Sequence, residues 1–310
     1  MPILQQNAPI AAALKHLSVC ICTYKRPDLL HRLLDKLRDQ ETGGLFTYSI
    51  VVVDNDAAES AKTTVQGFAS SSSIPIRYCM QPQQNISLTR NMAVANAAGD
   101  FVVFIDDDEF PIPQWLFFLF KTCNEYDVDG VLGPVRRHFD VQPPDWIIKG
   151  EFYERPILPT GSAVPWQDGR TGNVILKKEL FANQPEPFKP EFRGGEDTDF
   201  FRRMIDQGHK FIWSAEAIAY ETVPPSRWNR KFILKRALLR GAVTLTNPNF
   251  GTREILKSLV AVPLYALMLP FALLLGQHRF MVLLVKLCDH LGKLLALVGI
   301  DPIKGPYVTG

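Results

Sequence analysis

The chain has 310 residues, of which 46% are hydrophobic and 21% are charged, so it is long enough to bury a large core in one domain or two. Its formal net charge at pH 7 is only +2. This balance gives no general electrostatic reason to bind nucleic acid, and we expect no nucleic-acid partner.

The N-terminus and the cysteines bear on where the protein works. The first 16 residues, "MPILQQNAPIAAALKH", have no basic residue before their short apolar patch, so we expect no signal peptide. The five cysteines are an odd number without metal-type spacing, which predicts reduced thiols in a reducing compartment. Both features favour a cytoplasmic protein.

The first half of the chain alternates short apolar runs with amphipathic segments. "LSVCICTY" is a β-type run, and "RPDLLHRLLDKLRDQ" follows with leucines at helical spacing and Pro27 near its first turn. Further strands are expected at "YSIVVVDND", "IPIRYCM" and "DFVVFID", and further helices at "AESAKTTVQGFAS" and "ISLTRNMAVANAAG", the latter ending at Gly99 as a C-cap. This alternation predicts βαβ units, and hence an α/β fold with a mostly parallel sheet flanked by helices.

Polar residues collect where the predicted strands end. Asp54 ends the second strand, Asp106 and Asp108 end the fourth, and Asn85 precedes the third helix. Ligands of open α/β sheets bind at the carboxyl ends of the strands. Carboxylates gathered there suit a hard divalent cation that also binds phosphates. The alternative is a solvated acidic turn, which the strand-end position and the nearby Asp54 disfavour.

Four stretches carry a resemblance to a known family: "SVCICTYKRPDLL", "VVVDND", "NISLTRNMAVANAAGDFVVFIDDDE" and "GGEDTDFFRRM". Together they resemble family 2 glycosyltransferases with the GT-A fold, in particular bacterial exopolysaccharide glucosyltransferases of the succinoglycan type. Each motif alone is weak, but the four occur in the family's order within about residues 17 to 240. The resemblance implies transfer of a sugar, with inversion, from a nucleotide diphosphate donor, with Mn²⁺ or Mg²⁺ as cofactor. A UDP-sugar donor and a glycan or lipid-linked saccharide acceptor are expected.

The resemblance also implies roles for single residues of the nucleotide and metal sites. Asp106 and Asp108 match the first and last acids of the family's D-x-D motif, which bind the ribose or the metal, whereas Asp107 is the variable middle position and is expected to point away. Asp54 matches the acid that hydrogen-bonds uracil, with Asp56 as its neighbour. The other expected nucleotide contacts are Thr23, Tyr24, Arg26, Asn85, Arg90 and Asn91.

The stretch "FRGGEDTDFFRRM" offers a general base for the incoming hydroxyl group. Gly194 and Gly195 allow a close backbone approach, and three acids follow them. By resemblance, Asp197 is the general base and Glu196 positions the acceptor or the base. The alternative is a helix N-terminus enriched in acids because of the helix dipole, which explains one acid better than three.

One position departs from the family. Relatives often carry a His after the catalytic helix that completes the metal site, but this chain has Tyr220 and Glu221 there. We expect Glu221 or a water molecule in its place, or weaker metal binding.

The segment 133–170 is rich in Pro, Gly and Trp, which is typical of a substrate loop. Trp146 and Trp166 could stack on a sugar ring, although a structural role is at least as well supported. A return strand is expected in "RTGNVILKKE", where Asn173 resembles the family's residue near the donor sugar.

The last quarter of the chain changes in composition. Residues 222–253 contain no acid but seven basic residues, of which Arg236 and Arg240 share a helix face and could meet an acceptor diphosphate or lipid headgroups. Residues 258–277 are uncharged and long enough to cross a bilayer, but Pro263 and Pro270 argue against a straight span. We expect monotopic attachment to the cytoplasmic face of the bacterial inner membrane. The alternative is a soluble helical subdomain.

These patterns predict a catalytic domain at 1–225, with a nucleotide-binding half at about 17–110 and an acceptor half at about 111–225, and a helical C-terminal region at 226–310. Two other functions compete. A nucleotidyltransferase would have a Gly-rich loop after the first strand, which "CTYKRPD" lacks. A non-catalytic nucleotide-sugar-binding scaffold would be favoured if the acids were lost, but Asp106, Asp108 and Asp197 are present.

Overall fold

The computed structural model describes residues 14–192, 194–246 and 251–300. The N-terminal segment expected to lack a signal peptide lies almost wholly outside them. The chain forms two compact units: residues 1–136 with 155–221, and residues 137–154 with 222–310. The expected domain boundary at 225 thus falls just inside the second unit, and segment 137–154 belongs to that unit as well.

The first unit is built on a seven-stranded sheet in the order β3-β2-β1-β4-β8-β6-β9. Strands β1 to β4 are parallel, whereas β8 runs antiparallel to both β4 and β6. The expected mixed, mostly parallel sheet is confirmed. Its strands are β1 (Lys15–Thr23), β2 (Phe46–Asp54), β3 (Ile76–Met80), β4 (Phe101–Phe104), β6 (Gly130–Leu132), β8 (Val174–Lys177) and β9 (Phe211–Trp213).

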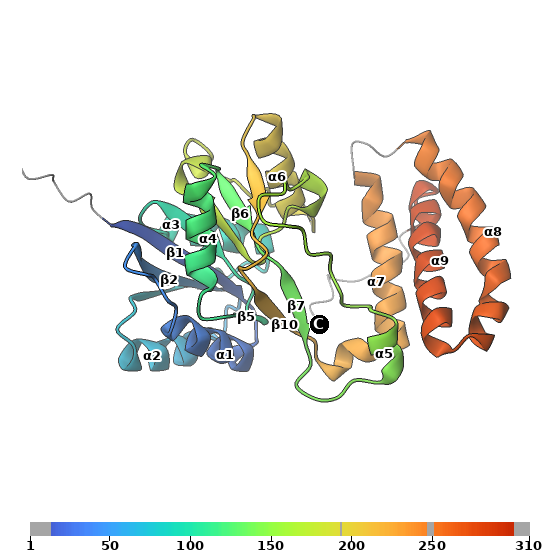
Figure 1. Ribbon diagram of the computed structural model, residues 1–310, viewed down its shortest axis with the longest axis horizontal. Helices are drawn as coiled ribbons and strands as arrows, with labels where there is room; N and C mark the ends of the chain where they lie inside the picture. Colours follow the sequence, from blue (N-terminus) through green and yellow to red (C-terminus); the bar gives the residue numbers. More distant parts are fainter. Residues whose placement is uncertain (1–13, 193, 247–250, 301–310) are drawn as a thin grey trace, which may run out of the picture. The chain divides into compact units, whose positions relative to one another are not determined.

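Helices cover both faces of this sheet, which explains why the central strands are apolar throughout (Figure 1). On one face, α1 (Pro27–Arg38), α2 (Lys62–Ser71) and α4 (Trp115–Glu125) pack against alternate residues of β1 and β2, such as Val19 and Val52. On the other face, α3 (Ile86–Asn96) and α6 (Glu196–Asp206) pack against the intervening residues. The two cores hold the strand ends rigidly in place.

The sequence pattern suggested that α3 ends at Gly99, but the structure shows an earlier end. The helix ends at Asn96, and its C-cap Ala97 is already extended, with φ −71° and ψ 137°. Gly99 has φ +74°, and a Cβ atom there would lie 2.5 Å from the carbonyl oxygen of His16. The glycine is therefore needed where the chain turns tightly past β1.

A second, three-stranded sheet has the order β5-β10-β7, and all three strands follow β4 in the sequence. It consists of β5 (Glu109–Pro111), β10 (Ala219–Thr222) and β7 (Val135–His138). Strands β5 and β10 are antiparallel and pair Glu109 with Glu221. This pairing brings Glu221 beside the acidic run that follows β4. Short helical turns complete the chain at α5 (Asp145–Lys149), η1 (Trp166–Asp168), η2 (Lys178–Phe181), η3 (Pro225–Trp228) and η4 (Thr244–Thr246).

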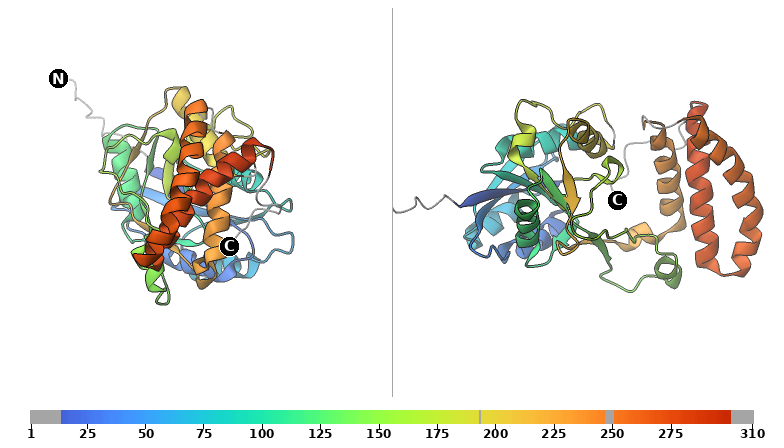
Figure 2. Two further views of the ribbon diagram at one scale, coloured as in Figure 1. Left: turned by 90° about the vertical axis from the view of Figure 1, so that its right-hand side faces the viewer. Right: turned by 45° about the horizontal axis from the view of Figure 1, so that its top comes forward.

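The second unit contains α7 (Arg230–Val243), α8 (Thr252–Leu274) and α9 (Gln277–Leu297), and both α7 and α8 pack against α9 (Figure 2). The α7–α9 crossing is close, because a Cβ atom on Gly241 would lie 2.1 Å from the carbonyl oxygen of Asp289. The C-terminal region is therefore helical, as expected.

Helix α8 contains both prolines, and much of its surface is exposed. By length and composition alone it could cross a membrane, a test that core helices of soluble proteins also pass, but only 11% of its apolar window is buried inside the protein. Leu267, Phe271 and Leu274 are 70%, 65% and 85% exposed. It is the one such candidate among the described residues.

Candidate active site

The acidic run after β4 faces two different environments. The side chain of Asp106 is 48% exposed, whereas those of Asp107 and Asp108 are largely buried. Arg26 lies 3.0 Å from Asp107 Oδ1 and 3.3 Å from Asp108 Oδ2, and Thr23 Oγ1 donates to Asp107 Oδ2 at 2.8 Å. Asp107 was expected to point away from the site, but it is buried and fixes the loop after β1, because a buried carboxylate needs donors.

Crowding of carboxyl groups perturbs their ionisation. Although part of the Asp106 side chain is exposed, its crowded surroundings desolvate the carboxyl group. This desolvation and the charges of Asp108 and Asp107 raise the pKa of Asp106 to about 7, against the opposing effect of Arg90. Burial and Asp106 likewise raise the pKa of Glu109 well above its usual range. A nearby cation would relieve this repulsion.

The donor set fits a hard divalent cation that takes part of its coordination from a substrate. Asp106 and Asp108 supply carboxylate oxygens, the ligands that Mn²⁺ and Mg²⁺ accept. In the described part of the chain, no group of three His, Cys, Asp or Glu side chains is arranged to hold a metal by itself. Water or substrate oxygens would have to complete the coordination.

Asp54, expected to bind uracil, is wholly buried at the end of β2. Its Oδ1 accepts a hydrogen bond from the Asp56 amide at 3.0 Å, and its Oδ2 accepts from the Ala61 amide at 2.8 Å and from the Tyr78 hydroxyl at 3.0 Å. These contacts shape the loop between β2 and α2. Asp56 is also largely buried and caps the same loop through the Ala58 amide, at 3.2 Å.

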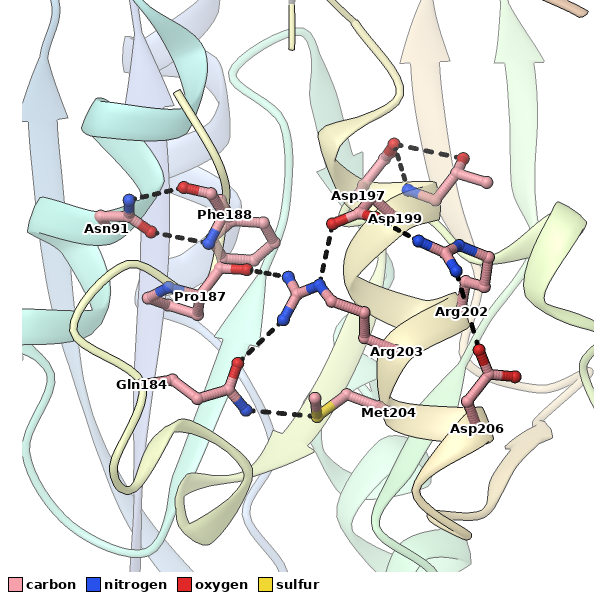
Figure 3. Close-up of polar contacts among 11 residues, drawn as sticks. Asn91, Gln184, Pro187, Phe188, Asp197, Asp199, Arg202, Arg203, Met204 and Asp206 are labelled. Atoms are coloured by element: carbon pink, nitrogen blue, oxygen red, sulfur yellow. Dashed lines mark hydrogen bonds and ion pairs between the residues drawn. The ribbon is translucent and has the colours of Figure 1, made fainter. Parts of the chain in front are cut away.

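Asn85, the N-cap of α3, and Asn91 within the helix hold another part of the chain. Asn85 Oδ1 caps the helix by accepting from the amides of Ser87 and Leu88, while its Nδ2 donates to the Pro190 carbonyl at 3.0 Å. Asn91 forms a two-point clamp on Phe188, donating to its carbonyl at 2.7 Å and accepting from its amide at 2.9 Å (Figure 3). The segment that leads into α6 is therefore tied to α3.

Arg90 joins the acidic run to the start of α6. Its buried guanidinium pairs with Glu196, and its Nη2 lies 4.0 Å from Asp106 Oδ1. Burial raises the pKa of Glu196, and Arg90 opposes the shift. The other carboxylate oxygen of Glu196, Oε2, is buried without a hydrogen-bond partner in the described structure. The ion pair brings together two motifs that are far apart in the sequence.

The acids in the first turn of α6 have different surroundings. The helix begins after Gly195, whose φ of +81° is rare for residues with a side chain. Asp197 is half-buried and accepts from the Thr198 amide at 2.7 Å. Asp199 is buried and receives hydrogen bonds of 2.8 Å from both Arg202 and Arg203 (Figure 3). Asp197 is thus the more exposed of these two carboxylates, while Asp199 stabilises the helix.

Asn173, expected near the donor sugar, is wholly buried, with φ +58°. Its Oδ1 accepts from Trp115 Nε1 at 2.7 Å, and its Nδ2 donates to the carbonyls of Pro134 and Ala217 at 2.9 and 2.7 Å. The amide therefore ties three segments to the start of β8. Trp166 is partly buried and packs against the core beside α6.

The remaining expected acceptor contacts belong to the second unit, whereas the carboxylates above belong to the first. Trp146 lies on α5, with its ring 5.4 Å from that of Phe152. Arg240 forms a bidentate ion pair with Asp289 on α9, at 3.0 and 2.6 Å. Arg236 lies on α7 and is exposed.

Sequence reasoning missed several residues that line the acidic cluster. A Cβ atom on Gly172 would lie 2.8 Å from Glu109 Oε1 and 3.0 Å from Asp106 Oδ2. Glu221, where a metal-site His was sought, pairs with Arg155 at 2.6 Å. The two glycines that flank Arg170 in "GRTGN" could have indicated a closely packed segment near the site. The sequence around Arg155 contains no comparable pattern.

Comparison with known proteins defines the class. The model of glycosyl transferase family 2 matches residues 18–181. The succinoglycan biosynthesis protein ExoM of Rhizobium meliloti (strain 1021) is 35% identical over 230 residues, or 73% of each chain. The chain therefore belongs to glycosyl transferase family 2. Hyaluronan synthase of Pasteurella multocida is 26% identical over 249 residues, but the match covers only 25% of that longer protein.

Solved structures confirm the GT-A fold. Mannosyltransferase PcManGT from Pyrobaculum calidifontis, solved with GDP-Man and Mn²⁺, matches with a TM-score of 0.62 at 16% identity, over 94% of this chain and 91% of that one. TarS of S. aureus matches with a TM-score of 0.53 at 18% identity, over 76% of this chain and 40% of that one. At these identities the likeness concerns the fold alone.

Proposed function

We propose that this glycosyltransferase moves a sugar from a UDP-sugar to a glycan or lipid-linked saccharide, with inversion and with a divalent metal, in bacterial exopolysaccharide synthesis. The observation that carries the proposal is the Arg90 network, which joins Asp106 to Glu196, the neighbour of Asp197. The name of the Rhizobium relative supports the pathway. TarS bound to UDP and UDP-GlcNAc, and the mannosyltransferase with Mn²⁺, support the donor and the metal.

The donor side of the site lies at the carboxyl ends of β1, β2 and β4. Asp106 and Asp108 would hold Mn²⁺ or Mg²⁺, which when bound neutralises charge that develops on the departing diphosphate. Tyr24 and Arg26 would line the nucleotide pocket, and the buried Thr23 would support it by holding Asp107. Asp54, Asn85 and Asn91 would serve it indirectly, because their hydrogen bonds fix the surrounding loops.

On the acceptor side, Asp197 would take the proton of the acceptor hydroxyl group. That oxygen forms a bond to the anomeric carbon on the face opposite the diphosphate, while the bond from this carbon to the phosphate oxygen breaks. The configuration of the sugar therefore inverts. Glu196, held by Arg90, would fix the start of α6 so that Asp197 faces the substrate.

The exposed apolar face of α8 supports attachment to the cytoplasmic face of the inner membrane, without a full span. Fully exposing large aliphatic side chains forfeits ~1.5–3 kcal/mol each relative to burial, so a lipid surface would stabilise this face. A lipid-linked acceptor would then be available at the same surface.

A donor screen tests the proposal. Purified protein is incubated with a membrane extract of lipid-linked saccharides, a divalent metal and a panel of UDP-, GDP- and dTDP-sugars, and release of nucleoside diphosphate is measured. We expect release from one UDP-sugar, dependent on both metal and extract. Binding of UDP without turnover of any donor would favour the non-catalytic scaffold, and absence of UDP binding would refute the donor assignment.

A further inference from the structure

The segment before β8 is held tightly between α6 and the acidic cluster. A Cβ atom on Gly169 would lie 2.4 Å from Cγ of Phe201 on α6. At the other end, Gly172 lies against Glu109 and Asp106. The backbone of Arg170 and Thr171 is therefore held by the packing of these neighbouring glycines.

The side chains of Arg170 and Thr171 lack hydrogen-bond partners in the described part of the chain. Arg170 Nε and Thr171 Oγ1 are both buried without a hydrogen bond, and Arg170 forms no ion pair with any described residue. The guanidinium of Arg170 lies over the ring of Trp213, with Cζ 5.5 Å from the ring centroid. An unsatisfied buried donor costs ~1–3 kcal/mol, and buried polar groups in native proteins nearly always have a partner.

The buried charge of Arg170 indicates what kind of partner it needs. Burial lowers the pKa of Arg170, and the positive charge of Arg155 lowers it further, while Glu109, Asp168 and Asp197 oppose the shift. A water molecule could satisfy one N–H group, but the guanidinium would still have no ion-pair partner among the described residues. An anion beside it would supply both the hydrogen bond and the opposite charge.

We propose that Arg170, with Thr171, binds an anionic group, phosphate or carboxylate, that belongs to the acceptor. The proposal rests on the proposed function, because it places this group near the proposed base, Asp197. The acceptor is favoured over the donor because Gly169, the neighbour of Arg170, packs against Phe201 on α6, the helix that carries Asp197. Arg90 is the cation next to Asp106, on the donor side.

Calorimetry with inorganic phosphate as the probe tests this site. Phosphate is titrated into protein saturated with UDP and Mg²⁺, and UDP is titrated separately. We expect phosphate to bind the wild-type UDP complex and R170Q to weaken that binding at least about tenfold, the loss expected for one charge-assisted contact. R170K should retain part of the affinity, and UDP affinity should change less than about twofold.

R77Q is the matched control, because Arg77 is exposed on β3 and bonds only to Asn96 at the surface. It should bind phosphate and UDP like the wild type, and melting curves verify that every variant is folded. Equal phosphate binding by wild type and R170Q, or no phosphate binding to the UDP complex, overturns the proposal. If R170Q instead weakens UDP about tenfold, the anion is the donor diphosphate and the acceptor assignment is wrong. Failure of UDP to bind the wild type would refute the donor assignment separately.

Discussion

Among the single residues of the site, the expected contacts fall into two groups. Asp54, Asn85 and Asn91 use their polar atoms to hold the protein's own loops, whereas Asp106 and Asp197 keep exposed carboxylate surface. Substitutions in the first group should act mainly on stability. Substitutions in the second group should act mainly on binding and turnover.

Asp108 tests the metal assignment. The Asp108→Ala change removes one of the two carboxylates that would hold the metal, so metal-dependent UDP binding should weaken at least about tenfold, equivalent to ~1.4 kcal/mol. Calorimetry with UDP, with and without Mn²⁺, measures it. Asp206→Ala is the control, because the Asp206 side chain is 63% exposed at the end of α6. Equal Mn²⁺-dependent affinity in the Asp108 variant and the wild type would remove Asp108 from the metal site.

The sequence predicted the acids but not their contacts. The position of Asp106 to Asp108 at a strand end followed from apolar runs and strand order. That Asp107 turns inward to Arg26 did not, because the two residues are 81 positions apart and meet only once β1 and β4 pair. Arg155 and Arg170 were missed for the same reason, since their environment is set by tertiary packing.

At the scale of helices and strands, the clamp between α3 and the segment before α6 orders the site. Asn91→Leu removes both hydrogen bonds to Phe188 and leaves the backbone amide and carbonyl of Phe188 unsatisfied. We expect a loss of ~1–3 kcal/mol in the free energy of unfolding and reduced transfer, because Asp197 follows this segment. Urea denaturation measures the first effect. Asn124→Leu, at an exposed position on α4, is the control, and equal stability of the two variants would show that the clamp is dispensable.

Helix α6 should also show a defined pH dependence. Burial alone would raise the pKa of Asp199, but hydrogen bonds from Arg203 and Arg202 outweigh it and lower the pKa below its usual value of about 3.9. A carboxyl group whose pKa is lowered on folding stabilises the folded state at pH values above its unfolded-state pKa. This contribution is lost as the pH falls through the folded-state pKa. Asp199→Asn should therefore be less stable than wild type at pH 7, and the difference should shrink below about pH 4. A difference in urea midpoint that stays constant from pH 7 to pH 3 would contradict this.

The order of strands and helices in the first unit was predictable because hydrophobic residues recur along each segment with the period of a helix or form the apolar run of a buried strand. Leu30, Leu33, Leu34 and Leu37 recur at helical spacing and are all buried on α1. The end of α3 was misplaced because Gly99 also suits a turn, and only its contact with His16 shows which role it has. Segment 137–154 was expected in the acceptor half of the catalytic domain but belongs to the second unit, because its contacts lie far along the chain.

For the molecule as a whole, the exposed face of α8 predicts where the protein partitions. Full-length protein should sediment with membranes and resist high-salt extraction, because apolar contact is insensitive to screening. Replacing Leu267, Phe271 and Leu274 together by Gln should release folded protein, since these side chains are exposed and hold nothing inside the unit.

The matched control carries three Gln substitutions at exposed apolar positions of the first unit, Leu45, Tyr126 and Ile157. It should sediment like the wild type. If the wild type stays in the soluble fraction without detergent, α8 is not a membrane contact and the case for a lipid-linked acceptor loses this support.

The most direct test of the whole account is the turnover of Asp197→Asn with the donor found in the screen. The substitution keeps the size of the side chain but removes the base, so UDP affinity in the presence of metal should be unchanged while transfer falls at least ~100-fold. Asp206→Asn, on the same helix, should transfer normally. Normal transfer by Asp197→Asn would contradict the assignment of the base, and with it the catalytic role proposed for this end of α6.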